Sequence, residues 1–227
     1  MISITLLALL WEVQEVVAIT AAFSIVMCFY LAWRLRSHIS LREIWPMMLG
    51  ASVGIPLGVT ALTSLDPRFI KGSLGAFLVV YSTWSLWSRK PSDKKISRLW
   101  SLPAGFLGGI LSGAFNTGGP PVVLYGTERQ WSPNSFRGNV QGFFAPCSAL
   151  TLSLLSYKGV VTAESLVWNF KLLPFLVVGM VLGDRMATGV EEERFRRILL
   201  FCLLAIGLVF LRSFTLPAAV GVPLTAV

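Results

Sequence analysis

Long runs of apolar residues without a charged side chain constrain this sequence more than any other feature. They lie at Val16–Trp33, Ile44–Leu65, Gly72–Ser88, Leu99–Thr127, Gly138–Tyr157, Leu172–Gly183 and Ile198–Leu211. A helix needs about 20 mostly apolar residues to span a bilayer, and most of these runs reach that length with their flanks. Only 13% of the 227 residues are charged, whereas soluble domains carry roughly 25%. A soluble chain of this size could not bury six such helices, so the sequence predicts an all-α integral membrane protein.

The charged residues, the cysteines and the single histidine exclude several other classes of protein. The net charge of +8 fits loops retained in the cytoplasm, and no basic stretch is interleaved with aromatic residues outside the apolar runs, so we expect no nucleic-acid partner. Cys28, Cys147 and Cys202 lie far apart within apolar runs and form no disulfide or metal framework. The segment Gly109-Ile110-Leu111-Ser112-Gly113 faintly resembles a serine-protease motif, but the single histidine, His38, lies in a basic loop and leaves Ser112 without a catalytic base. We therefore expect no enzyme, no metal and no cofactor.

The most polar stretch, residues 89–98, divides the chain into two halves of similar design. We predict a first membrane repeat over residues 1–88, a cytoplasmic linker over 89–98 and a second membrane repeat over 99–227. Each half contains three clear spans, which gives about six full spans. Each half also contains one span with small residues four apart, a spacing that lets helices approach closely; these residues are Gly50, Gly54 and Gly58 in the first half and Gly179, Gly183 and Ala187 in the second.

The run Leu99–Thr127 contains an interruption that no continuous helix can pass. Its centre reads Asn116-Thr117-Gly118-Gly119-Pro120-Pro121, and proline lacks the amide donor and collides with the preceding turn. The segment is either a broken spanning helix or a re-entrant hairpin. Re-entry places 14 of the 19 Lys and Arg residues on one side, which is the more asymmetric arrangement that the positive-inside rule favours. Because three spans per half is an odd number, the two pseudo-symmetric halves are then inverted repeats, a recurring transporter design.

The same interruption is the candidate site. The glycine pair Gly118 and Gly119 allows backbone amides to face a ligand, and Pro120 and Pro121 suit the first turn of a short helix over Val122–Gly126. A helix N-terminus attracts a small anion, to which Asn116 and Thr117 would add donors. The alternative is a simple structural kink.

A second set of polar residues follows the interruption. Arg137 and Gln141 share a helix face at i, i+4 and would add a formal charge if that face looks toward the loop. For Arg137 the alternative is an arginine at the membrane interface.

The segment from Gly113 to Tyr125, Gly-Ala-Phe-Asn-Thr-Gly-Gly-Pro-Pro-Val-Val-Leu-Tyr, resembles the second signature of the TauE/SafE sulfite and organosulfonate exporter family. Ser135-Phe136-Arg137-Gly138-Asn139 resembles the segment that follows this signature. The resemblance implies a transporter that exports a small sulfur-containing anion, such as sulfite or an organosulfonate, across the bacterial plasma membrane. Members carry a related glycine-rich motif near the N-terminus. Met1–Leu10 aligns best with Pro121–Gln130, so we expect this chain to begin just past its own first loop.

The combined expectation is a multi-pass transporter that binds a small oxyanion near the middle of the bilayer and works by alternating access. The candidate substrate-binding residues are Asn116, Thr117, Gly118, Gly119, Pro120, Pro121, Arg137 and Gln141. A proton is the candidate coupling ion. The alternative function is that of a non-transporting or degenerate member of the family that acts in assembly or interaction.

Overall fold

The computed structural model describes residues 13–87, 96–162 and 192–215, with isolated positions between 165 and 178. Within these ranges the regular structure is helical throughout, as the apolar runs predict. The α-helices are α2 (Val13–Arg34), α3 (Leu41–Ser64), α4 (Pro67–Trp87), α5 (Ser101–Phe115), α6 (Gly119–Glu128), α7 (Pro133–Tyr157) and α9 (Glu192–Thr215), and two short 3-10 helices are η1 (Arg36–His38) and η2 (Arg98–Trp100).

Three described helices, α2, α3 and α4, are long and apolar enough to cross a membrane. They match the first three apolar runs of the sequence. The 25 residues of α7 also exceed the length that a span needs, and this helix carries several buried polar residues that lower its hydropathy. The predicted span Leu172–Gly183, with its small-residue spacing, lies outside the described residues except at isolated positions.

Helices α3 and α5 run parallel and pack backbone against backbone. On α3, Gly54 faces Phe106 so closely that a Cβ atom would collide with the Phe106 carbonyl oxygen. On α5, Gly109 faces Ala51 in the same way, with a Cβ only 2.7 Å from the Ala51 Cα. The predicted glycine face of α3 is therefore confirmed as a close-approach surface. Its partner is a second stripe on α5, made of Gly105, Gly109 and Gly113.

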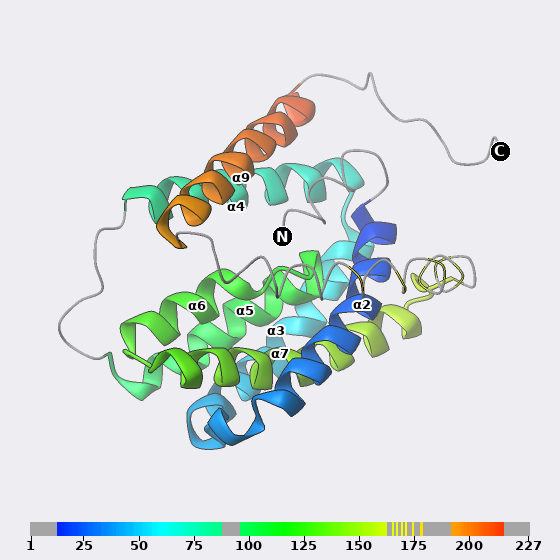
Figure 1. The fold of residues 1–227 in the computed structure, drawn as a ribbon. Coiled ribbons are helices and arrows are strands. Elements are labelled where there is room, and N and C mark those ends of the chain that lie inside the picture. The colour runs from blue at the N-terminus through cyan, green and yellow to red at the C-terminus, as the bar shows by residue number, and fades with distance from the viewer. Residues whose placement is uncertain are drawn as a thin grey trace.

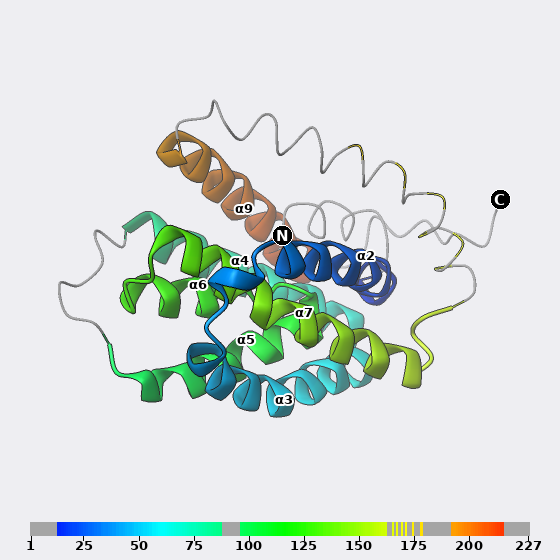
Figure 2. The same cartoon turned by 60° about the horizontal axis from the view of Figure 1, so that its bottom comes forward.

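The remaining helices surround this pair. Figures 1 and 2 show α6 beside α5, with α7 across them and in contact with both α2 and α3. Helices α4 and α9 form a separate pair on one side of the bundle (Figure 1), where Gly75 and Gly207 bring their backbones together. The core is lined by one face of α3, which buries Met47, Ala51, Ile55, Val59 and Leu62.

Helices α5 and α6 form a hairpin whose two ends lie together. The Ile96 amide, just before α5, donates to the Glu128 carbonyl at the end of α6, and Arg129 Nη1 donates back to the Ile96 carbonyl at 3.1 Å. Glu43 in the first turn of α3 accepts hydrogen bonds from both Arg98 and Arg129. The start of α3, the start of α5 and the end of α6 thus meet at one end of the bundle, and the hairpin tip lies deep inside it.

Candidate functional site

The hairpin tip is formed by a residue in the left-handed conformation. Asn116 caps the C-terminus of α5 with φ 51° and ψ 32°, a region that asparagine tolerates better than most residues. Its amide donates to the Ser112 carbonyl at 2.8 Å, and the Thr117 amide donates to the Leu111 carbonyl at 3.1 Å. The first bond satisfies the Ser112 carbonyl, which the end of α5 would otherwise leave unpaired, and the second ties the tip back to the last turn of the helix.

The two glycines that follow have different surroundings. A Cβ atom at Gly118 would collide with Ser112 Oγ and with the Gly108 carbonyl oxygen, so the close return of the chain over α5 requires glycine there. A Cβ at Gly119 would meet nothing within 4 Å. Gly118 is therefore needed for packing, whereas Gly119 borders open space.

Helix α6 begins with an unusual set of donors. The four amides around a helix start have no partner within the helix, and here those positions are Gly118, Gly119, Pro120 and Pro121. The two prolines have no N–H, which removes two unpaired donors from the bundle interior. The amides of Gly118 and Gly119 remain, together with the partial positive charge of the helix N-terminus.

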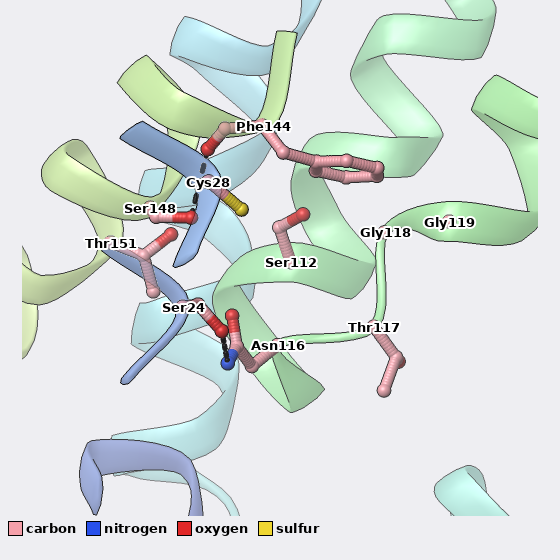
Figure 3. Close-up of a pocket in the computed structure, with 10 residues that line it drawn as sticks. All are labelled: Ser24, Cys28, Ser112, Asn116, Thr117, Gly118, Gly119, Phe144, Ser148 and Thr151. Carbon is pink, nitrogen blue, oxygen red and sulfur yellow. Dashed lines mark hydrogen bonds between the residues drawn. The ribbon is translucent and has the colours of Figure 1, made fainter. Parts of the chain in front are cut away.

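A pocket of about 180 Å³ lies at this helix start (Figure 3). A single water needs only about 10–15 Å³ on a comparable measure, so the pocket has room for a small polyatomic solute. The residues that line it come from α2, α5, the hairpin tip, the start of α6 and α7; they are Ser24, Cys28, Ser112, Asn116, Thr117, Gly118, Gly119, Phe144, Ser148 and Thr151.

Some of the polar groups in the pocket are engaged with the protein. Asn116 Nδ2 donates to Ser24 Oγ at 2.9 Å, which ties the hairpin tip to α2. Ser24 Oγ in turn donates to the Thr20 carbonyl at 2.8 Å. On α7, Ser148 Oγ donates to the Phe144 carbonyl at 2.8 Å. These bonds hold the walls in place.

Other polar groups are buried without a partner in the described part of the chain. The Thr151 side chain is 0% exposed, and its Oγ1 has no hydrogen-bond partner. Figure 3 shows it on the α7 wall beside Ser148, facing the side of the pocket where Ser112 and Cys28 also point. Thr117 Oγ1 is unpartnered as well, although its side chain points away from this group. A buried hydroxyl left unpaired costs about 1–3 kcal/mol, so Thr151 is suited to donate to a solute or water.

Comparison with known proteins identifies the family of this chain. The family model for the sulfite exporter TauE/SafE matches residues 1–210. The chain belongs to the TauE/SafE family. One relative is a probable inner membrane transporter, TsaS of Comamonas testosteroni, 27% identical over 172 residues, which are 74% of this chain and 70% of the relative. Another is a probable sulfite/organosulfonate exporter, TauE of Cupriavidus necator, 23% identical over 184 residues, 80% of this chain and 70% of the relative.

Membership in TauE/SafE makes this chain a multi-pass membrane transporter rather than an enzyme. No solved structure matches the chain. Among the described residues, no group of three or more His, Cys, Asp or Glu side chains is placed to hold a metal ion.

The structure brings together only part of the predicted TauE/SafE site. Asn116, Thr117, Gly118 and Gly119 line the pocket. Pro120 is buried and Pro121 half-buried in the first turn of α6, and neither lines the pocket.

Arg137 and Gln141 stand apart from the pocket on α7. Arg137 is exposed near the start of the helix, and Gln141 is half-buried one turn further on. They share a helical face with Phe144 because seven residues are close to two full turns. Gln141 Oε1 is buried and has no hydrogen-bond partner among the described residues. This face leads from the exposed end of the bundle toward the pocket.

Six pocket residues were not predicted from the sequence. They are Ser24, Cys28, Ser112, Phe144, Ser148 and Thr151. For α7 a signal exists, because Gln141, Phe144, Ser148 and Thr151 follow the spacing of one helical face. For α2 the sequence offers only isolated polar residues in an apolar run, which do not indicate which face turns inward.

Proposed function

We propose that this TauE/SafE chain exports a small sulfur-containing anion, sulfite or an organosulfonate, across the bacterial inner membrane. The observation that carries the proposal is the pocket at the start of α6. Gly118 and Gly119 line it at the helix N-terminus, and Thr151 lines it on α7 with a hydroxyl that has no partner in the described part of the chain. Hydrogen-bond donors around the positive end of a helix suit an oxyanion. One relative is named a probable inner membrane transporter, which supports the membrane, and another a probable sulfite/organosulfonate exporter, which supports the substrate class.

The proposed topology has six spans, a re-entrant α5–α6 hairpin and a cytoplasmic face at the base of that hairpin, opposite its tip. Supporting it, the hairpin ends meet at Ile96 and Glu128, and exposed Trp33, Trp45 and Trp100 surround the same end of the bundle. Tryptophan is enriched at membrane interfaces. In this arrangement residues 1–88 and 99–227 are inverted repeats joined by the cytoplasmic linker 89–98.

Alternating access would move the α2–α7 pair against the unit formed by α3, α5 and α6. The glycine interface makes α3 and α5 a single packed body, and the pocket lies between this body and the two outer helices. One side-chain bond that joins the two parts at the pocket is Asn116 to Ser24. Separation of the two parts would expose the pocket to one side of the membrane. A proton could accompany the anion.

Arg137 and Gln141 would act along the entry path. The exposed Arg137 would attract anions to the cytoplasmic end of α7, and the half-buried Gln141, one turn deeper, would donate its side-chain N–H to them. This role differs from direct coordination in the pocket.

The test is binding and flux in a matched pair of variants on α7. Thr151→Val keeps the shape of the side chain and removes the hydroxyl, so it should weaken binding of methanesulfonate or sulfite by about 1 kcal/mol, roughly fivefold. Ser153→Ala lies two residues away on the exposed face and should leave binding unchanged. Calorimetry on purified protein and anion efflux from proteoliposomes provide the measurements. Wild-type protein that neither binds nor moves these anions would refute the proposal.

A further inference from the structure

The ten residues that line the pocket carry no formal charge. They offer hydroxyl, thiol and amide groups, two glycine backbones and one phenyl ring. These ten residues can therefore attract an anion only through dipoles, chiefly that of the start of α6, where Gly118 and Gly119 border the pocket. A helix N-terminus is equivalent to roughly +0.5 of an elementary charge. One such terminus compensates about half of the charge of a monoanion and about a quarter of that of a dianion.

The charge of the solute enters the two opposing energies differently. The cost of moving an ion out of water rises with the square of its charge, so it is roughly fourfold larger for a dianion than for a monoanion of the same size. The attraction to fixed dipoles rises only in proportion to the charge. A site built from neutral donors around one helix start therefore favours the singly charged form of an oxyanion.

A formal positive charge lies nearby but not in the pocket. Arg137 is on the same face of α7 as Phe144, seven residues earlier, which places it about 10 Å away along the helix axis. Its side chain is exposed. At physiological ionic strength the screening length is about 8 Å, so Arg137 attracts anions of either charge to the entrance and distinguishes them weakly inside the pocket.

We infer that the pocket selects singly charged oxyanions, namely organosulfonates and hydrogensulfite, over dianions such as sulfite and sulfate. This inference rests on the proposed function and specifies its substrate class. A sulfonate group has one charge at every physiological pH. Sulfite has two charges, and it becomes singly charged only by taking up a proton, which occurs near neutral pH. For sulfite, the transported proton would then be carried by the substrate itself as hydrogensulfite.

Two isosteric anions provide the test with the wild-type protein. Methanesulfonate and sulfate are both tetrahedral and similar in size, and they differ by the replacement of one anionic oxygen by a methyl group. We expect sulfate to bind at least tenfold more weakly than methanesulfonate in calorimetric titrations. A difference below tenfold would overturn the inference and leave the proposed function standing. Failure of methanesulfonate, sulfate and sulfite alike to bind would overturn the proposed function and the inference together.

A pH series provides an independent readout. The apparent affinity for total sulfite should fall about tenfold for each pH unit above the second pKa of sulfurous acid, because the fraction of hydrogensulfite falls by that factor. The affinity for methanesulfonate should stay constant across the same range, which controls for changes in the protein. A sulfite affinity that stays constant or rises with pH would overturn the inference.

Discussion

Arg129 and Glu43, which are 86 residues apart, join the end of α6 to the start of α3 with a distance of 3.0 Å from Nη2 to Oε1. Arg98, just before α5, donates to the same carboxylate oxygen. Glu43 is largely buried, with 13% of its side chain exposed. One carboxylate thus fixes both ends of the hairpin whose tip forms the pocket, which makes it a positioning residue distant from the solute.

Replacement of Glu43 should loosen the base of the hairpin. Glu43→Gln leaves Arg98 and Arg129 facing each other without a counter-charge, and we expect a loss of about 1–3 kcal/mol in stability. Thermal unfolding in detergent measures this effect. In a double-mutant cycle with Arg129→Gln, the coupling should reach about 1 kcal/mol; strictly additive effects would show that the ion pair does not hold the hairpin.

Because glycines line the interface between the parallel helices α3 and α5, the stability of the protein should depend strongly on side-chain size there. Gly54→Ala places a methyl group against the Phe106 backbone, and a rigid carbonyl can give way only if the helices separate. We expect about 1–3 kcal/mol of destabilisation. Ser52→Ala, an exposed position on the same helix, should change stability by less than about 0.5 kcal/mol. Equal unfolding temperatures for the two variants would contradict the observed packing.

The sequence predicts the helices of this protein well because a segment that crosses lipid has few alternatives to a long apolar helix. Uninterrupted apolar runs mark α2, α3 and α4, and the Gly-Gly-Pro-Pro sequence marks the break between α5 and α6. The predicted glycine face on α3 has its partner on α5, which the sequence analysis did not identify. The glycine spacing shows that one face of α3 carries small residues. Which helix packs against that face depends on how the α5–α6 hairpin folds back.

The sequence predicts only those pocket residues that form the break between α5 and α6. Asn116 to Gly119 are recognisable because a helix break at membrane depth needs polar surroundings. Ser24 and Thr151 are ordinary helix residues, and only tertiary packing turns them toward the tip. The face that Arg137 shares with Gln141 does lead toward the loop, but Arg137 itself is exposed near the start of α7 and does not line the pocket.

The adjacent glycines Gly118 and Gly119 should respond differently to the same substitution. Gly118→Ala meets Ser112 Oγ and the Gly108 carbonyl, so unfolding should become easier by about 1–3 kcal/mol. Gly119→Ala meets open space and should preserve the unfolding temperature while weakening anion binding, because the methyl group narrows the lining. Stability and calorimetric affinity, measured in parallel, distinguish the two roles. The structure would be contradicted if Gly119→Ala were the more destabilising change.

The conformation and the side chain of Asn116 can be tested separately. Asn116→Gly preserves the left-handed backbone and removes the bond to Ser24, whereas Asn116→Ala removes the bond and adds roughly 1–2 kcal/mol of backbone strain. We expect alanine to lower stability more than glycine does. Transport should be impaired in both variants because the tie to α2 is lost. Normal flux in Asn116→Gly would exclude this hydrogen bond from the transport cycle.

Arg137 should govern the rate at which anions reach the pocket more than their affinity within it. Its side chain is exposed about two helical turns from Phe144, a distance at which salt screens its field. Arg137→Gln should therefore slow efflux from proteoliposomes at low ionic strength, and the difference from wild type should shrink as salt is raised. Arg42→Gln, an exposed arginine at the same end of the bundle, should have a smaller effect because it does not lie on the α7 face that leads inward. If Arg137→Gln instead reduced calorimetric affinity equally at low and high salt, Arg137 would coordinate the anion directly, and the entry-path role would be wrong.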